Sequence, residues 1–203
     1  MKIYSIKLKS KNNSNIFNVK TNMGEFDFFG DIIVKYSFSE NEVNDELFYS
    51  ALKESEVLIA TNIAMKYLSS RLKTERQIKE YLSKKKFSED SIVQVLFKLK
   101  EYKVIDDSEY ALSYIRSNSQ NSKMRLKQKL SRSGVNKDLI EKAIINIDDY
   151  ASCFENAKKY LRNKEVNKET CEKLTRRLQY LGYSWDTIKK VLSRLSNLDF
   201  DEY

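Results

Sequence analysis

The 203-residue sequence has no histidine and no proline, only four glycines and only two cysteines. Without histidine it lacks the side chain that most often serves as a general base or as a metal ligand. It contains neither a GxxxxGK[ST] nor a GxGxxG motif, and four glycines leave little material for a phosphate-cradling loop. We therefore expect a protein that is not an enzyme and that holds no cofactor.

Long hydrophobic runs are also missing. None approaches the roughly 18 to 20 apolar residues of a membrane span. The first residues alternate polar and apolar side chains and lack the apolar stretch of a signal peptide. Cys153 and Cys171 have no clustered cysteine near them, which favours buried free thiols in a reducing compartment. These features predict a cytoplasmic protein that does not associate with membranes.

Two carboxylate pairs, Asp106-Asp107 and Asp148-Asp149, are the remaining candidates for a metal site, since they could hold Mg²⁺. Each pair stands between two predicted helices, where aspartate is a favoured N-cap. We therefore predict helix caps at both pairs and no metal site.

What the sequence does contain is a repeat. Leu82, Leu130 and Leu178 are spaced 48 residues apart. The positions around each leucine repeat with it: Ile78, Leu126 and Leu174 four residues before, Phe87, Val135 and Tyr183 five residues after, and Ile92, Ile140 and Ile188 ten residues after. A period of this length is typical of a repeated supersecondary unit.

Apolar periodicity predicts three helices in each copy. The predicted helices span 57–70, 74–85 and 88–101, then 107–118, 122–133 and 136–146, then 149–163, 168–181 and 184–197. The fold class is therefore mainly α, a tandem array of three three-helix repeats of period 48. The predicted division is a mixed α/β unit over 1–55, repeats over 56–106, 107–148 and 149–198, and an acidic tail over 199–203.

The N-terminal unit shows strand-like alternation. Strands are predicted at about residues 3–8, 16–20 and 26–28, with polar turns between them. Residues 32–36 fit either a strand or a helical turn. Asn44 or Asp45 is expected to cap a helix that ends near Lys53.

Capping residues support the three-helix division. Thr74 and Gln77 form a predicted capping box. Ser88, Asn136 and Ser184 occupy equivalent N-cap positions before the third helix of each copy. Gly134 and Gly182 follow the second helices, where a left-handed C-cap favours glycine, and the first copy has Lys86 there.

Charge is distributed unevenly. Residues 1–55 hold 7 basic and 8 acidic side chains, whereas residues 56–203 hold 30 and 21. The repeats are thus the basic part, which favours a polyanionic or acidic partner. An ordinary solvated helical surface rich in lysine is the alternative.

Basic side chains recur on corresponding helices. The second helix of copy two carries only basic charges, and that of copy three has basic residues and Tyr180 at helical spacing, where tyrosine could stack on a base. Further clusters are Lys84-Lys85-Lys86 and Lys158, Lys159, Arg162 and Lys164. The candidate partner- or DNA-binding residues are Arg71, Lys84, Lys85, Lys123, Arg125, Lys127, Lys129, Arg132, Lys158, Arg162, Lys173, Arg176 and Arg177. DNA binding through them would be mainly to phosphates and sensitive to salt.

The sequence resembles the RecX family of recombination regulators over about residues 57–197. The most specific motif is a hydrophobic-Asp-Asp-x-x-aromatic-Ala string, present here as Ile105-Asp106-Asp107-Ser108-Glu109-Tyr110-Ala111. The other residues that carry the resemblance are 64–71 (AMKYLSSR), 74–82 (TERQIKEYL), Val95-Leu96 with Leu99, 125–130 (RLKQKL), Gly134-Val135 and 181–183 (LGY). Two departures are Lys86 before Phe87, where a glycine is frequent, and the acidic tail.

The resemblance implies a non-enzymatic protein of DNA repair and the SOS response. Such a protein binds RecA and its filament on single-stranded DNA, and usually inhibits the recombinase. We expect a monomer that lies along the filament groove through its basic helical faces. On this interpretation Arg71, Arg125, Lys129, Arg132, Arg176 and Arg177 pair with acidic RecA surface or with DNA phosphate. Two alternatives stay open: a direct DNA-binding protein of helix-turn-helix-like modules, and a helical scaffold for an acidic protein.

Overall fold

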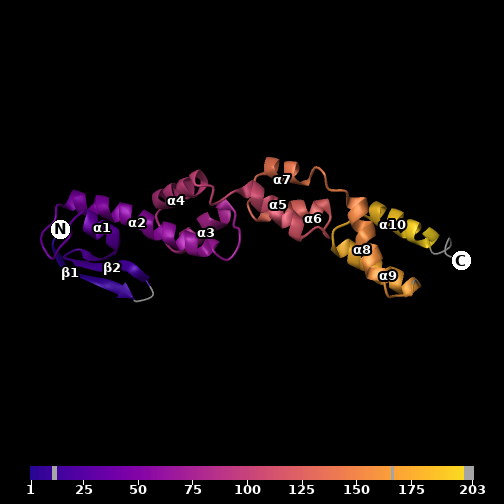
Figure 1. Cartoon of the computed structure of the whole chain (residues 1–203), viewed down its shortest axis with the longest axis horizontal. Helices are drawn as coiled ribbons and strands as arrows, with labels where there is room; N and C mark the ends of the chain where they lie inside the picture. Colours follow the sequence, from indigo (N-terminus) through magenta and orange to yellow (C-terminus); the bar gives the residue numbers. More distant parts are fainter. Residues whose placement is uncertain (11–12, 166, 199–203) are drawn as a thin grey trace. The chain divides into compact units, whose positions relative to one another are not determined.

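The structure, a computed structural model, describes residues 1–10, 13–165 and 167–198 (Figure 1). It divides into two compact units, Met1–Ile105 and Asp106–Tyr203. The predicted acidic tail, 199–203, lies outside the described residues. Among the helices of the described ranges, none is both long enough and apolar enough to cross a lipid bilayer.

The first unit begins with an antiparallel sheet of three strands in the order β1-β2-β3. The strands are β1 (Ile3–Ser10), β2 (Asn13–Thr21) and β3 (Gly24–Phe29). Gly24 has a φ of +137°, a backbone conformation that favours glycine, and it pairs with Thr21 where the chain turns into β3. The three predicted strands are confirmed.

A short helix, α1 (Gly30–Lys35), follows β3, so the ambiguous segment 32–36 is mostly helical. The long helix α2 (Asp45–Leu68) then packs on β3. Phe28, Phe38 and Phe48 meet between sheet and helix, with ring centroids 5.2 Å apart for Phe28 and Phe48 and 5.8 Å apart for Phe38 and Phe48. This aromatic cluster is the core of the sheet.

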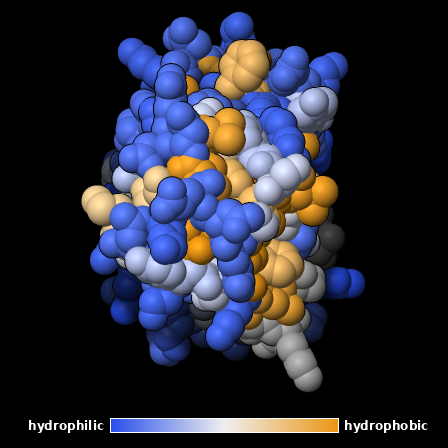
Figure 2. All heavy atoms as spheres, turned by 90° about the vertical axis from the view of Figure 1, so that its left-hand side faces the viewer, coloured by the Kyte–Doolittle hydropathy of each residue, from blue (hydrophilic) through white to orange (hydrophobic). Residues whose placement is uncertain are grey.

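Seen end-on, the N-terminal part presents a surface of mixed polarity (Figure 2). Hydrophilic side chains cover most of this face, and apolar side chains form a band among them. Exposed apolar residues in this part of the chain include Tyr4, Leu8, Val34 and Leu47. The N-terminal part therefore exposes apolar side chains among hydrophilic ones on this face.

Helix α2 corrects one prediction. The sequence predicted a helix ending near Lys53 and another over 57–70, but the structure has one continuous helix of 24 residues. No glycine or proline interrupts residues 45–68, so the backbone has no reason to break. Its N-terminal half buries Phe48 and Ala51 against the sheet, and its C-terminal half buries Ala60 and Ala64 in the next core. The helix passes from one core to the next without a break, and the boundary predicted between residues 55 and 56 falls inside it.

The first repeat consists of the C-terminal half of α2 together with α3 (Glu75–Lys84) and α4 (Glu89–Glu101). Its core includes Ile78, Leu82, Val95 and Leu99, all nearly inaccessible to solvent. The Glu56 carboxylate of α2 accepts hydrogen bonds from the backbone N–H and hydroxyl of Ser88 and from the hydroxyl of Ser91. This carboxylate therefore ties α2 to the start of α4.

The second unit contains the other two repeats, six helices in all within the described residues. The second repeat consists of α5 (Asp107–Ser117), α6 (Lys123–Arg132) and α7 (Lys137–Ile144), around Leu130 and Ile140. The third consists of α8 (Asp149–Leu161), α9 (Lys168–Tyr180) and α10 (Trp185–Leu198), around Leu178 and Ile188. The repeating leucines and isoleucines are buried in every copy, with the half-buried Phe87 of the first copy the one partial exception among the repeating positions.

The predicted caps are present. Thr74 and Gln77 form the capping box, and Ser88, Asn136 and Ser184 each accept a backbone N–H of the following helix. Gly134 and Gly182 have φ values of 91° and 88°, and Lys86 has a φ of 66° at the equivalent point. The first repeat thus adopts the same left-handed turn without the residue that favours it.

Candidate functional site

Helix α6 displays a dense group of basic side chains. Leu126 and Leu130 are buried, which fixes the face that points inward. No acidic residue occurs in the helix, and Ser122 caps it by accepting the backbone N–H of Arg125. Its basic residues therefore lie on the outward and lateral faces of the helix. Some of them contact residues of α7 or the residue that follows it, and one contacts the third repeat.

Two of the candidates on α6 turn toward α7. The Lys127 ammonium pairs with the Glu141 carboxylate, and the Lys123 ammonium lies 3.5 Å from the carbonyl oxygen of Ile145. Both side chains thus have partners inside the second repeat. Lys129 is exposed, and it forms no ion pair with any residue in the described part of the chain.

Arg125 points the other way, to the third repeat. Its guanidinium carbon lies 4.4 Å from the ring centroid of Tyr180, an arrangement in which the cation is attracted by the ring. Tyr180 itself is 73% exposed. Gly182 makes this approach feasible, because a Cβ there would lie 2.7 Å from Ser122 Oγ and 3.0 Å from Arg125 Cβ. The structure therefore joins the basic helices of the second and third repeats at one point.

Hydrogen bonds hold the two repeats together around that point. The Ser122 N–H donates to the Leu181 carbonyl at 3.0 Å, and the Lys123 N–H donates to the Asp149 carboxylate at 2.7 Å. The hydroxyl of Tyr183, which is buried, donates to the Gln120 carbonyl at 2.9 Å. Burial raises the pKa of Tyr183, so its hydroxyl stays protonated as this contact requires. These bonds fix the position of α6 relative to α9.

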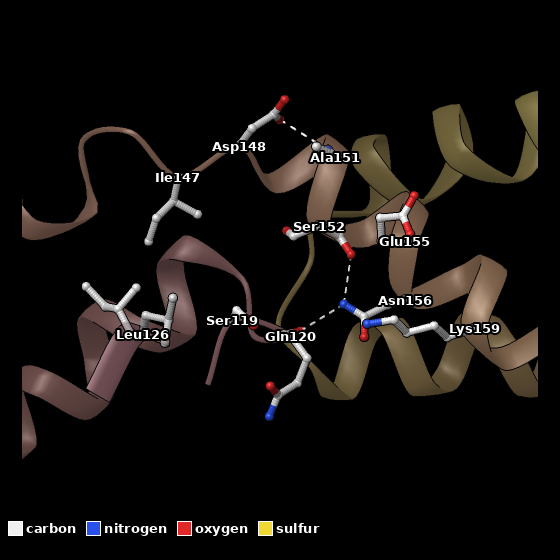
Figure 3. A pocket seen from close by; sticks show the side chains of 11 residues that line it. Ser119, Gln120, Leu126, Ile147, Asp148, Ala151, Ser152, Glu155, Asn156 and Lys159 are labelled. Carbon is white, nitrogen blue, oxygen red and sulfur yellow. Dashed lines mark hydrogen bonds between the residues drawn. The ribbon is translucent and has the colours of Figure 1, made fainter. Parts of the chain in front are cut away.

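A hollow of about 470 Å³ lies next to this junction (Figure 3). The Asn156 amide donates to the Ser152 carbonyl of its own helix at 2.8 Å and to the Gln120 carbonyl of the second repeat at 3.3 Å. Asp148 is turned to its own helix, where its carboxylate accepts the Tyr150 and Ala151 N–H groups. Among the described residues no cluster of acidic or cysteine side chains is suited to a metal ion.

The predicted aspartate caps are present before α5 and α8. Asp106 and Asp148 cap α5 and α8, and Asp149 caps the first turn of α6 across the repeat junction. The two cysteines are free, with Cys153 buried and Cys171 half-buried. Burial, with a smaller contribution from Asp149, raises the pKa of Cys153 to about 11. That thiol is thus a packing residue, not a nucleophile.

The candidates on α8 and α9 divide into two groups. Lys173 and Arg176 each lie near an acidic residue of the preceding turn, at 2.5 Å from Glu169 and 3.9 Å from Glu172. Lys158 lies 3.8 Å from Glu155. Arg162 and Arg177 instead line one hollow at the end of α8, together with Tyr160. The sequence did not show that these two arginines share a site.

In the first unit, three candidates are exposed: Arg71, Lys84 and Lys85. Lys85 lies 5.8 Å from the ring centroid of Tyr81, which stacks on Tyr67 at 4.1 Å. On the other ring, the Lys73 ammonium lies 4.4 Å from the Tyr67 centroid. Burial, and to a lesser degree the neighbouring Arg71, lowers the pKa of Lys73. This column of rings and lysines has an evident packing role.

Sequence reasoning missed two contacts between a cation and a ring, that of Arg125 with Tyr180 and that of Lys164 with Tyr160. The first depends on how two repeats pack, which no local pattern records. The second had a signal, because Tyr160 and Lys164 are four residues apart at the end of a helix.

Comparison with known proteins gives the same family for both units. Residues 60–99 match the model of the RecX first three-helix domain, and residues 106–144 match that of the RecX second three-helix domain. A protein of Clostridioides difficile (strain 630) called "Regulatory protein RecX" is 34% identical over 86% of this chain and 85% of its own length. One of the same name from Clostridium perfringens (strain 13 / Type A) is 30% identical over 99% of both chains.

Solved structures agree on the fold. A crystal structure titled as regulatory protein RecX superposes with a TM-score of 0.64 over 95% of this chain and 98% of its own, at 20% identity. The crystal structure of RecX from Lactobacillus salivarius gives a TM-score of 0.59 at 25% identity, covering 70% of this chain and 97% of its own.

Proposed function

Because the chain belongs to the RecX family of regulatory proteins, a family of non-enzymatic regulators of recombination, we propose that it binds RecA and its filament on single-stranded DNA. It acts there as an inhibitor, a cytoplasmic monomer that lies along the filament groove through its basic helical faces. The observation that carries this proposal is the stacking of Arg125 on Tyr180, which joins the basic sides of α6 and α9.

The basic surface that α6 and α9 form together suits an extended acidic partner. Lys129 and Arg132 follow Arg125 at helical spacing on α6, and Arg176 precedes Tyr180 by one turn on α9. A cation held against an aromatic ring keeps its charge, so Arg125 can still attract a carboxylate or a phosphate. Complementary charge of this kind accelerates association and fixes register more than it adds affinity.

Lys123 and Lys127 are weaker candidates within this proposal, because their ammonium groups already have partners on α7. The same holds in part for Lys158, Lys173 and Arg176, whose acidic neighbours lie in their own helices. Surface pairs of this kind are worth only about 0 to 1 kcal/mol, so a partner could still recruit these side chains.

The test is the single-stranded-DNA-dependent ATPase activity of RecA, measured while the chain is added below one copy per RecA. We expect suppression well below that ratio, because one regulator seated on a filament affects many RecA subunits. Suppression that begins only when the DNA is saturated would indicate competition for DNA. An unchanged ATPase rate would leave the helical scaffold as the better account and would overturn the proposal.

A further inference from the structure

The hollow at the end of α8, called here the α8–α9 pocket, is lined by an excess of positively charged side chains. It measures about 510 Å³ and lies between the last turn of α8, the residues that follow it and α9. Four cations line it, Lys159, Arg162, Lys164 and Arg177, beside Tyr160. No acidic side chain is part of its lining.

Among the described residues, the four cations have no carboxylate within ion-pair distance. Within residues 1–10, 13–165 and 167–198, no ion pair involves any of them. Their neighbours Lys158, Lys173 and Arg176 all have a carboxylate within 4 Å, so acids are available nearby but do not face the pocket. Like charges at close quarters repel each other, and an anion bound among them would relieve that repulsion.

Tyr160 explains how the cations are held. The Lys164 ammonium lies 3.3 Å from its ring centroid, and the Arg177 guanidinium carbon lies 5.9 Å from it. A ring attracts a cation through its quadrupole without neutralising it, whereas a carboxylate would cancel the charge. The tyrosine therefore positions two cations and leaves their charge available to a ligand.

The partial negative charge at the C-terminus of α8 does not by itself account for this group of cations. Cations near the C-terminus of α8, which ends at Leu161, do complement the partial negative charge of that end. That end carries only about half an elementary charge, which is far less than the charge of four cations. Most of the positive charge therefore has no partner among the residues that the structure describes.

We propose that the α8–α9 pocket binds single-stranded DNA directly, with its cations on backbone phosphates. Arginine and lysine donors in a concave site beside an aromatic ring are the combination that single-strand sites use. The hollow has room for about one nucleotide, which favours a flexible strand over the broad face of a duplex. Such a contact with DNA is separate from RecA binding, because it can form whether or not RecA is present.

The experiment measures fluorescence anisotropy of a labelled oligothymidylate, with no RecA present. The pocket variant carries Lys159→Glu, Arg162→Glu and Lys164→Glu. The matched control carries Lys137→Glu, Lys142→Glu and Lys190→Glu, the same change of charge on exposed positions of α7 and α10. Emission of Trp185, the one tryptophan of the chain, reports on the folding of the third repeat in each variant.

We expect the pocket variant to bind the oligonucleotide at least about tenfold more weakly than the control. The slope of log affinity against log salt should fall by about 0.7 for each phosphate that the variant no longer neutralises. Tyr160→Leu keeps all four cations but removes the ring that positions them, so it should weaken binding severalfold. Tyr160→Phe keeps the ring and should bind like the wild type.

Three results would overturn the proposal. Equal affinities of the folded pocket variant and the control would show that the cations do not contact DNA. An equal reduction in affinity for a duplex of the same length would show that the site does not select single strands. Unchanged DNA binding together with abolished binding to RecA filaments would assign the pocket to a protein partner. Since the DNA assay contains no RecA, its failure leaves the proposed function untouched.

Discussion

At the scale of single residues, Glu56 shows how one side chain links two elements. Its carboxylate accepts three hydrogen bonds at the N-terminus of α4, from Ser88 and Ser91. Partial burial by itself would raise the pKa of Glu56, but these hydrogen bonds outweigh it and hold the pKa below its ordinary value of 4.5. The ionised carboxylate is therefore the form that stabilises the fold.

This predicts a pH dependence with a definite sign. Because the folded pKa is depressed, the contribution of Glu56 is fully present above about pH 4.5 and is lost as the pH falls through the folded pKa. Glu56→Gln should cost about 1 kcal/mol at pH 7, after allowance for solvent screening. Hydrogen exchange in α4 should then be faster in the variant at pH 7.

The same measurement at low pH provides the control. Wild type and variant are compared with each other at each pH, so the intrinsic pH dependence of exchange cancels. The difference between them should shrink at a pH low enough to protonate the carboxylate, below its depressed folded pKa. A difference that stays constant between the two pH values would contradict the assigned role of the charge.

Single residues were predicted well where the reason was local. The buried leucines of each copy, the capping residues and the aspartates before α5 and α8 all follow from short-range patterns. The contact of Arg125 with Tyr180 could not be predicted, because it depends on the packing of two repeats and on the missing Cβ of Gly182.

At the scale of elements, the three left-handed turns after α3, α6 and α9 form a natural comparison. Two have glycine, and the third has Lys86 at a φ of 66°. An L-residue in this conformation costs about 1 to 2 kcal/mol relative to a right-handed one, and glycine avoids most of that cost. The first repeat therefore carries strain that the other two do not.

Lys86→Gly should therefore stabilise the first unit by about 0.5 to 1 kcal/mol, after the greater backbone freedom of glycine in the unfolded chain is deducted. Urea unfolding followed by circular dichroism measures the gain. Gly182→Ala is the opposite control, since a Cβ there would come within 2.7 Å of Ser122 Oγ, and it should destabilise the third repeat. A loss of stability in Lys86→Gly would show that the lysine side chain contributes more than the turn costs.

Helix ends were predicted to within a few residues because caps mark them in the sequence. Helix α2 was the exception, since nothing local distinguishes a helix that passes from one core to another from two helices in succession. Hydrophobic periodicity records which side of a helix is buried, not against which element it packs.

At the scale of the whole chain, net charge does not distinguish the two units. Residues 1–105 hold 18 basic and 14 acidic side chains, and residues 106–203 hold 19 and 15. What differs is the distribution, because α6 concentrates basic residues with no acid among them. The arrangement of charge on particular helices, more than its total, therefore supports the choice of partner.

The central claim is that the basic face of α6 binds the RecA filament. The most direct test compares a variant with Arg125→Glu, Lys129→Glu and Arg132→Glu against the control with Lys137→Glu, Lys142→Glu and Lys190→Glu, which has the same net charge. Both are titrated into the RecA ATPase reaction, after circular dichroism confirms that they are folded. The proposal predicts that the α6 variant needs at least about tenfold more protein for half-inhibition, while the control stays near wild type. A folded α6 variant that inhibits at wild-type concentrations would contradict it.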